Sequence, residues 1–428
     1  MEHAPNTASA AGGPEEAHQA TRPPKWWKPG PALMVTACFV GPGTVTTASL
    51  AGADFGMTLM WAVLFSILAT IVLQEMAARL GLASGLSLGQ ALRRTITQPI
   101  LRLVVIVLVV SALGIGSAVY AQGDMLGTAL GLSEATGTPA QIWPLITFAA
   151  VSALLLTGRF TLIMRVLGVL VAIMAIVFVA TAIMVRPDPL AMLKGTFVPT
   201  VPDGSAFVII GLIGTTVVGY NLFLHSSGVI EYYPRGEHLK ESIKSARADT
   251  ALSITLGGLI TLAILATAAA AFFTTGIPVE SAATMATQLE PLLGPSARYF
   301  FAAGLFSAGL TSVIAGGLAA AFAVSTTLGW GQDLKSWRFR AIWLAVLGYG
   351  AIVATLGDNP IAAILFAQAT NGVLLPILAI TLLLVMNNRT LLGRHANSKL
   401  QNAVGALIVL VVIGLSLNSL LGLIGVTG

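Results

Sequence analysis

The sequence predicts an all-α membrane protein with eleven transmembrane helices, arranged as two inverted repeats of five helices and one additional helix. The composition indicates a membrane protein, because 56% hydrophobic and 9% charged residues leave too few charges to cover a soluble surface. A mean hydropathy of +0.88 agrees with this class. The repeats follow from two interrupted apolar stretches, which lie at corresponding places in the two halves of the chain.

Eleven apolar stretches are long enough to span a bilayer, and we number them helices 1 to 11 in chain order. They are 31–55, 58–82, 100–122, 143–158, 160–185, 206–229, 250–273, 299–328, 341–357, 360–386 and 402–426. Helices 1 to 5 (31–185) and helices 6 to 10 (206–386) would form the two repeats, and helix 11 (402–426) would be the addition. All of them belong to one transmembrane domain, 29–428.

The basic residues predict the orientation in the membrane. Of the 22 Lys and Arg residues, all except Arg186, Lys194 and Arg298 fall in segments on the same side as the N-terminus. By the positive-inside rule the N-terminus is cytoplasmic and the C-terminus is outside. This distribution explains the pI of about 9.5 without nucleic-acid binding. We expect an integral, multi-pass protein of the bacterial inner (plasma) membrane.

The first 28 residues are rich in Ala, Pro, Glu and Gly and lack apolar periodicity, which predicts a disordered cytoplasmic tail over 1–28. Lys25-Trp26-Trp27-Lys28 at its end has the composition of an interfacial anchor. The tail has no basic segment ahead of an apolar one, so no signal peptide is expected. The single cysteine, Cys38, excludes an intrachain disulfide.

Two breaks interrupt helices that would otherwise be continuous. Gly41-Pro42-Gly43-Thr44 interrupts helix 1, and Gly219-Tyr220-Asn221 interrupts helix 6. A break frees backbone amides and carbonyls that lipid cannot satisfy, so it is tolerated only where it lines a cavity within the protein. Paired breaks in corresponding helices of two repeats are typical of the substrate site of a secondary transporter.

The residues around these breaks resemble the Nramp (natural resistance-associated macrophage protein) family of metal transporters. The resemblance lies in Gly41-Pro42-Gly43-Thr44, Gly52-Ala53-Asp54-Phe55-Gly56, Gln74-Glu75-Met76-Ala77-Ala78-Arg79-Leu80-Gly81 and the helix 6 segment from Gly214 to Ser226. Weaker similarity continues through helices 3, 8 and 10. The resemblance implies the LeuT-like fold, with unwound helices 1 and 6, and metal ion transport of the symporter type.

The ligand positions of that family are changed here. In the family, an aspartate and an asparagine on helix 1 and a methionine and a backbone carbonyl on helix 6 hold the metal. Gly41 stands at the aspartate position, Thr44 at the asparagine, Val218 at the methionine, and Gly219 and Tyr220 at a proline and a histidine; the carbonyl position, Thr215, is matched, as are Asn221 and His225 beyond it. Because charge holds divalent ions and soft ligands select transition metals, we expect poor transition-metal selectivity, and the metal ligands stay unknown.

With Gly41 in place of the aspartate, the positive ends of the half-helices would favour a neutral or anionic group. Hydroxyls and amides near the breaks can bind such a group or a hydrated ion: Thr44, Thr46, Thr47, Thr215, Thr216, Tyr220, Asn221, Gln368 and Asn371. The candidate substrate-binding residues are Gly41, Thr44, Thr46, Thr215, Val218, Gly219, Tyr220, Asn221, Gln368 and Asn371. The alternative for Thr46, Thr47 and Thr216 is a hydrogen bond back to their own helix.

Asp124 is an acid within helix 3, and an ionisable group at membrane depth indicates function. It aligns with a glutamate of the Nramp proton path, whose preceding aspartate is replaced by Ala121. We expect a proton or charge relay at Asp124, or alternatively a structural pair with Arg340. The absence of carboxylates at Ala121 and Gly41 favours weak or absent proton coupling.

Two further polar groups have open roles. His225 lies one helical turn beyond Asn221, so it either relays protons near neutral pH or packs as a neutral side chain. Glu75 lies four residues before Arg79, which favours a salt bridge over a gating role.

No enzyme motif is present, neither GxxxxGK, HExxH, GxSxG nor paired cysteines, so we predict neither an enzyme nor a cofactor. Three functions remain: a secondary transporter resembling Nramp, moving a hard or hydrated divalent cation such as magnesium or manganese; a transporter of a small neutral or anionic solute on the same fold; and a membrane sensor that does not transport. The sensor is disfavoured because no soluble domain is attached. The expected partners are a small ion or solute and membrane lipid, and no nucleic acid.

Overall fold

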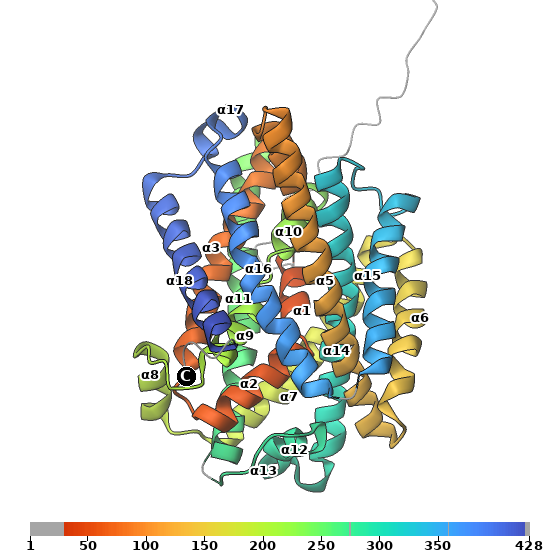
Figure 1. Cartoon of the computed structure of the whole chain (residues 1–428), viewed down its shortest axis with the longest axis vertical. Helices are drawn as coiled ribbons and strands as arrows, with labels where there is room; N and C mark the ends of the chain where they lie inside the picture. Colours follow the sequence, from red (N-terminus) through yellow and green to blue (C-terminus); the bar gives the residue numbers. More distant parts are fainter. Residues whose placement is uncertain (1–29, 274, 358, 424–428) are drawn as a thin grey trace, which may run out of the picture.

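The chain folds into a bundle of helices, most of which run along the long axis of the molecule (Figure 1). The structure, a computed structural model, describes residues 30–273, 275–357 and 359–423, and in these ranges it contains helices and no strands. The tail predicted over 1–28, with its Lys25-Trp26-Trp27-Lys28 anchor, lies outside the described residues.

The predicted helices are present in the predicted order. Helix 1 is α1 (Ala32–Phe39) and α2 (Pro42–Phe55), helix 2 is α3 (Met60–Ser84), helix 3 is α5 (Pro99–Thr136), helix 4 is α6 (Trp143–Leu156), helix 5 is α7 (Phe160–Val185), and helix 6 is α9 (Ala206–Thr216) and α10 (Asn221–Tyr232). Helix 7 is α11 (Leu239–Ala268), continued by the π-helix η3 (Ala269–Phe273), and helices 8 to 11 are α14 (Ala297–Leu328), α15 (Trp337–Leu356), α16 (Pro360–Met386) and α18 (Lys399–Leu423). The short helices between them are α4 (Leu88–Thr95), α8 (Pro189–Phe197), α12 (Ala282–Ala286), α13 (Glu290–Leu293) and α17 (Arg389–Leu392).

The helices have the length and apolarity of a polytopic membrane protein. Within the described ranges, nine are long and apolar enough to cross a membrane, and the bent pair α1 and α2 makes a tenth span. The shorter apolar helix over Ala140–Leu156 corresponds to the remaining predicted span. Helices 3 and 7 are longer than predicted, because polar residues that interrupt or flank their apolar stretches are still helical. The protein is an integral, multi-pass membrane protein.

Both predicted breaks are present. The axes of α1 and α2 differ by 54°, and Gly41 joins them in an extended conformation with φ −114° and ψ −174°. Pro42 then opens α2, where its missing N–H has no helical partner to lose. In helix 6, residues 217–220 separate α9 from α10. A Cβ on Gly219 would overlap Leu378 Cδ1 of α16, so a larger residue here would have to displace that side chain.

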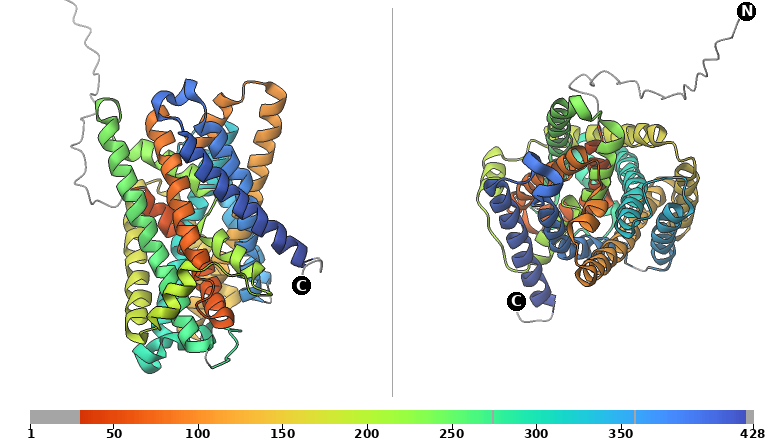
Figure 2. Two further views of the ribbon diagram at one scale, coloured as in Figure 1. Left: turned by 90° about the vertical axis from the view of Figure 1, so that its left-hand side faces the viewer. Right: turned by 90° about the horizontal axis from the view of Figure 1, so that it is seen from above.

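Small residues let the central helices approach closely. The contact between α5 and α14 is the most extensive in the molecule, and a Cβ on Gly309 would fall 2.7 Å from the backbone nitrogen of Thr128. On the outside, α5 and α18 carry exposed apolar side chains such as Leu103 and Leu410, as expected of lipid-facing surfaces. Figure 2 shows α18 along the edge of the bundle, leaning away from it at the C-terminal end.

A charged network closes the end of the molecule that holds α17, at the top of Figure 1. The Arg79 guanidinium is 4% exposed and pairs with Glu75 at 3.0 Å, which confirms the predicted salt bridge. Glu75 also pairs with Arg247 of α11 at 2.8 Å. Arg79 further donates to Asn397 Oδ1 at 2.9 Å, so the network ties α3 to α11 and to the segment that precedes α18.

The start of α1 is anchored at the same end. The Asp249 carboxylate of α11 accepts hydrogen bonds from the backbone N–H groups of Gly30 at 2.9 Å and Ala32 at 3.0 Å. These amides precede or open α1, where no helical acceptor is available to them. The first half of helix 1 is therefore held against α11.

The opposite end is closed by a neutral network. Gln288, next to α12, donates to the Ser49 hydroxyl of α2 at 3.2 Å and accepts from Thr267 of α11 at 3.2 Å. All three side chains are buried. Polar contacts therefore hold the helices together at both ends of the described structure.

Candidate substrate site

The two broken helices meet through a pair of threonines. The hydroxyls of Thr44 on α2 and Thr215 on α9 lie 2.7 Å apart, and Thr44 also donates to the Phe39 carbonyl at the end of α1. Because Thr44 has one proton and gives it to Phe39, Thr215 donates to Thr44. The Thr215 carbonyl accepts a 3.4 Å hydrogen bond from the Tyr120 hydroxyl. The Phe39 carbonyl at the break in helix 1 is thus satisfied by Thr44 of the same helix, and the Thr215 carbonyl of helix 6 is satisfied by Tyr120 of α5.

Asp124 of α5 lies beside the break in helix 1. A Cβ placed on Gly41 would be 3.3 Å from Asp124 Oδ1 and 2.6 Å from Ser312 Oγ of α14. Ser312 is also next to the Asp124 carboxyl, but it donates to the Cys38 carbonyl at 2.7 Å. Asp124 is 1% exposed, and its Oδ1 has no hydrogen-bond partner. Position 41 itself carries no carboxylate, as the sequence shows, but α5 brings the carboxyl group of Asp124 beside this glycine.

Tyr220 lies on the other side of the same space. A Cβ placed on Gly316 of α14 would be 3.9 Å from both the Tyr220 hydroxyl and Asp124 Oδ2. The Tyr220 ring packs edge-on against Tyr120, with 5.7 Å between ring centroids. Its hydroxyl is buried and has no partner. Gly316 thus leaves open the space that the phenol and the carboxylate both face.

Two amides complete the buried polar cluster. Asn221 at the start of α10 and Gln368 of α16 are both 0% exposed, and neither amide has a hydrogen-bond partner at oxygen or nitrogen. Gln368 packs against Gly43, where a Cβ would overlap its side chain, so it reaches the break in helix 1. A buried polar group without a partner costs about 1–3 kcal/mol, so four such side chains in one region indicate a binding site. We call Asp124, Tyr220, Asn221 and Gln368 the polar cluster.

The other candidate residues either lie buried near the breaks or donate hydrogen bonds to backbone carbonyls. Thr46 and Val218 are buried near the breaks, and Thr47 Oγ1 has no partner. Thr216 donates back to the Leu212 carbonyl at 3.1 Å, which confirms the alternative interpretation for that residue. The Asn371 amide donates to the Gly214 carbonyl, so this side chain helps to hold α9.

The structure also shows the surroundings of Arg340, the alternative partner of Asp124, and of His225. Arg340 donates to the Leu156 carbonyl at 3.2 Å, so the predicted structural pair with Asp124 is wrong. His225 Nδ1 lies 3.1 Å from Gln74 Oε1 of α3, while its Nε2 has no partner. This hydrogen bond fixes the ring against α3 and leaves one nitrogen available.

Three contributors to the site were missed by the sequence analysis: the Tyr120 hydroxyl, Ser312 and the Cys38 carbonyl. Tyr120 could have been found, because it lies one helical turn before Asp124 on the same face of α5. Ser312 carries no distinguishing signal within an α14 rich in small residues. Across the described residues, no group of three or more His, Cys, Asp or Glu side chains could hold a metal ion. Any cation site at the breaks therefore combines one carboxylate with neutral oxygens.

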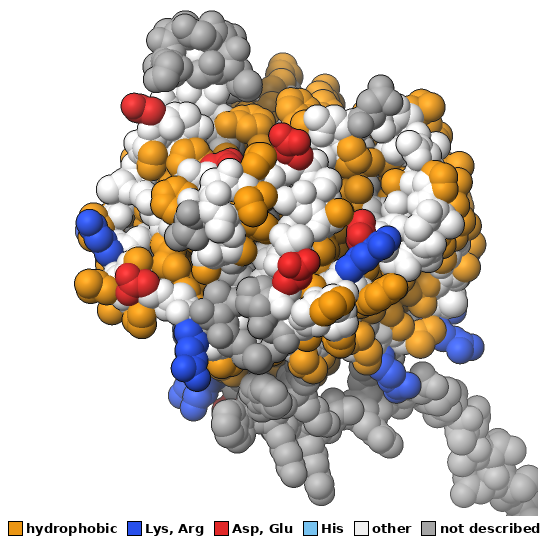
Figure 3. Space-filling view, turned by 90° about the horizontal axis from the view of Figure 1, so that it is seen from below, with side chains coloured by type: hydrophobic (Ala, Val, Ile, Leu, Met, Phe, Trp, Pro, Cys, Tyr) orange, Lys and Arg blue, Asp and Glu red, His pale blue; other side chains and the backbone are white. Residues whose placement is uncertain are grey.

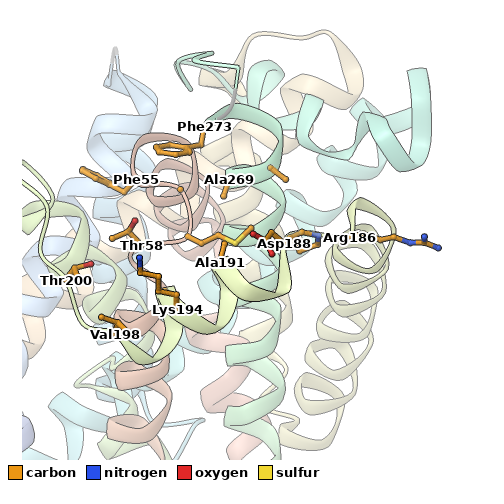
Figure 4. A pocket seen from close by; sticks show the side chains of 15 residues that line it. Phe55, Thr58, Arg186, Asp188, Ala191, Lys194, Val198, Thr200, Ala269 and Phe273 are labelled. Atoms are coloured by element: carbon orange, nitrogen blue, oxygen red, sulfur yellow. The ribbon is translucent and has the colours of Figure 1, made fainter.

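A cavity of about 520 Å³ opens at the end of the molecule that holds α8. Figure 4 shows Lys194 directed toward Thr58 among its lining side chains, while the Arg186 guanidinium points away. Phe55 at the end of α2 and Phe273 of η3 form apolar walls. The residues of the polar cluster are almost fully buried and do not line this cavity, so the cavity is separate from the polar cluster.

Acidic residues outnumber basic ones in the described segments that connect the helices at this end, which Figure 3 views from below. The acids here are Asp54, Glu134, Asp188, Asp203, Glu280 and Glu290, and the basic residues are Arg186, Lys194 and Arg298. Arg298 pairs with Glu134 at 2.7 Å. The face is negative overall, and such a field raises the local concentration of cations.

Comparison with known proteins gives a consistent result. The model of the family described as natural resistance-associated macrophage protein-like (Nramp) matches residues 32–422. The chain is 29% identical over 403 residues to a divalent metal cation transporter, MntH, of Klebsiella pneumoniae, and the alignment covers 92% of this chain and 94% of that protein. It is 29% identical over 410 residues to the MntH of Yersinia enterocolitica, with coverage of 92% and 95%.

Solved structures show the same fold. The manganese transporter of Eremococcus coleocola superposes with a TM-score of 0.76 at 20% identity, covering 91% of this chain and 85% of that one. Mhp1, a nucleobase-cation-symport-1 family transporter, superposes with a TM-score of 0.57 at 16% identity, covering 95% and 93%. At these identities the likeness concerns the fold, and it confirms the predicted LeuT-like arrangement.

Proposed function

The chain belongs to the natural resistance-associated macrophage protein-like (Nramp) family, and on this premise we propose that it is a secondary transporter of a divalent metal cation. The cargo is a hard or partly hydrated ion such as Mg²⁺ or Mn²⁺. The relatives from Klebsiella and Yersinia bear the name of divalent metal cation transporters, which supports this class of cargo.

The observation that carries the proposal is the polar cluster at the two breaks. It offers four buried side-chain oxygens, on Asp124, Tyr220, Asn221 and Gln368, among atoms that lack protein partners. Oxygen ligands suit hard divalent cations, and Mg²⁺ is commonly bound through one or two carboxylates while it keeps several waters. The cluster lies where paired breaks place the substrate of this fold.

Selectivity for soft transition metals is expected to be low. Val218 offers no thioether at the break in helix 6, and Tyr220 offers a phenol where the family has an imidazole. Thioether and imidazole ligands are those that favour soft and borderline metals. Because each 1.4 kcal/mol of lost interaction is a tenfold loss of affinity, we expect Cd²⁺ to bind with a Kd weaker than about 1 mM.

We place the end that holds α17 in the cytoplasm, and the membrane is the inner (plasma) membrane of a bacterium. Basic residues gather at that end, among them Arg93, Arg94, Arg235, Arg389 and Arg394. The negative face around α8, α12 and α13 is then on the outer side of the membrane, where it attracts cations toward the polar cluster.

A second candidate cargo is a small neutral or anionic solute. α2 and α10 each begin at a break, so their positive N-terminal ends lie there, and the amide nitrogens of Asn221 and Gln368 lack acceptors. Such donors favour a cargo with carbonyl or carboxylate oxygens.

Titration calorimetry of the purified protein separates these candidates. The panel comprises Mg²⁺, Mn²⁺, Ca²⁺ and Cd²⁺ as chlorides, with bicarbonate, phosphate and amino acids as sodium salts or free compounds. Saturable heat with Mg²⁺ or Mn²⁺, and uptake of the same ion by proteoliposomes, is the expected result. Binding of an anion or amino acid with no response to any divalent ion would refute cation transport.

A further inference from the structure

We propose that Asp124 is a direct ligand of the transported cation, and that α5 thereby supplies the carboxylate that is missing at position 41 in the break of helix 1. This inference rests on the proposed function, because it assigns one ligand of that same site. It differs from the relay role expected from the sequence, in which Asp124 would exchange protons without touching the cargo.

The position of the carboxylate is the first argument. An acidic side chain on residue 41 would have to extend from a Cβ, and the Cβ position lies 3.3 Å from Asp124 Oδ1. The Asp124 carboxylate therefore already occupies the neighbourhood that a helix 1 carboxylate would use. Glycine at position 41 keeps this neighbourhood free of a helix 1 side chain, since a Cβ there would also lie 2.6 Å from Ser312 Oγ and would force a shift.

The missing partner is the second argument. Asp124 is 1% exposed, its Oδ1 accepts no hydrogen bond, and the nearby Ser312 hydroxyl donates to the Cys38 carbonyl. The ion pairs found among the described residues involve other acids. A buried carboxylate is strongly unfavourable without a cation or hydrogen-bond donors. A bound divalent ion supplies that partner.

The neighbouring groups are the third argument. The Tyr220 hydroxyl faces the same space as Asp124 Oδ2, and the Asn221 and Gln368 amides at the two breaks also lack partners. One charged oxygen and several neutral ones on α5, α10 and α16 form a ligand set of the type that binds Mg²⁺ together with waters. A relay, by contrast, requires an onward proton acceptor, and position 121 on the adjacent turn is alanine.

The test compares Mg²⁺ binding by wild type, Asp124→Asn, Asp124→Glu and the control Glu241→Gln, an acid-to-amide change at an exposed site on α11. Calorimetry measures the affinity, and the midpoint of thermal unfolding with and without Mg²⁺ gives an independent readout. We expect Asp124→Asn to weaken Mg²⁺ binding by roughly 100-fold or more, which corresponds to about 2.7 kcal/mol. Asp124→Glu, which keeps the charge, should bind within about tenfold of wild type, and Glu241→Gln within about twofold.

The thermal midpoint guards against a folding defect. Without Mg²⁺, Asp124→Asn should be about as stable as wild type, because the amide has nearly the same size and the Asp124 Oδ1 that it replaces has no hydrogen-bond partner to lose. Mg²⁺ should raise the midpoint of wild type and leave that of Asp124→Asn unchanged. Wild-type affinity in Asp124→Asn would overturn the ligand role while cation transport stands. A wild-type protein that binds no divalent ion would instead refute the proposed function, and the ligand role with it.

Discussion

The glycine at position 41 allows a sharp test of where the site holds its negative charge. Restoring the family's aspartate with Gly41→Asp would place a second carboxylate beside Asp124 and against Ser312. We therefore expect the substitution to destabilise the protein in the absence of divalent cations, and to make its stability strongly dependent on them. An alignment alone would predict only a gain of affinity.

The magnitude follows from two separate terms. Two unit charges 4 Å apart repel by about 4 kcal/mol at an effective dielectric constant of about 20. This is an upper bound, because protonation of one carboxyl relieves the repulsion. The added atoms also meet Ser312, with 2.9 Å between the new Cβ and its Cβ, and overpacking a buried position typically costs about 1–3 kcal/mol.

The matched control is Gly41→Asn, which has nearly the same size and no charge. It bears the steric cost alone, so the difference between the two variants isolates the charge. The assay is thermal unfolding of the purified proteins, followed by tryptophan fluorescence with EDTA and with 10 mM-scale MgCl₂. Gly41→Asp should unfold at a lower temperature than Gly41→Asn in EDTA and should recover most of the difference with Mg²⁺. Equal midpoints in EDTA would show that residue 41 meets no ionised carboxylate and would refute the reasoning.

Three further predictions concern the second break and the two ends of the molecule. Asn221→Ala is expected to abolish cation uptake by proteoliposomes without affecting folding, because the buried Asn221 amide has no protein partner. Thr255→Val, at an exposed position on α11, is the control and should leave uptake unchanged. Normal uptake by Asn221→Ala would place the site elsewhere. Glu75→Gln should lower the free energy of unfolding by about 3 kcal/mol in denaturant titrations, because the change leaves the buried Arg79 guanidinium without its charged partner. A loss below about 1 kcal/mol would mean that the Glu75–Arg79 pair behaves as an exposed ion pair. Asp249→Ala removes the acceptor of two backbone amides at the start of α1. We therefore expect the rate of maleimide labelling of Cys38, the only cysteine, to rise roughly tenfold or more, and Asp249→Asn to give an intermediate rate. An unchanged labelling rate in Asp249→Ala would refute this prediction.

Much of the fold was predictable because the membrane simplifies the problem. Lipid cannot satisfy backbone polar groups, so each apolar stretch of sufficient length becomes a helix, and a break marks a place shielded by protein. This is why the bounds of helix 10 were predicted as 360–386 and found as Pro360–Met386. Helix 3 was predicted too short, because Gln122, Gly123 and Asp124 end its apolar run although the helix continues to Thr136 inside the bundle.

The site was predictable only in part, since alignment assigns ligands by position in the chain. Tyr220 and Asn221 were identified from the break itself, and both are buried without side-chain partners. The sequence also placed Gln368 near the site, but it could not distinguish this residue from Asn371. The Asn371 amide donates a hydrogen bond to the Gly214 carbonyl, whereas the Gln368 amide has no partner. That distinction depends on the direction in which α16 presents each amide, one turn apart, and no single sequence carries that information.

The location of the carboxylate shows the same limit in its strongest form. Residue 41 and residue 124 are separated by more than two helices along the chain, yet a side chain on the first would meet the carboxylate of the second. What a divalent ion requires is a negative charge at a given point in space, and the helix that delivers this charge is immaterial to the ion. A glycine at an expected ligand position therefore has two physical meanings, a lost ligand or a space cleared for one from another helix. The unpaired Oδ1 of Asp124 beside Gly41 favours the second, and it turns an apparent departure from the family's chemistry into a different route to the same charge.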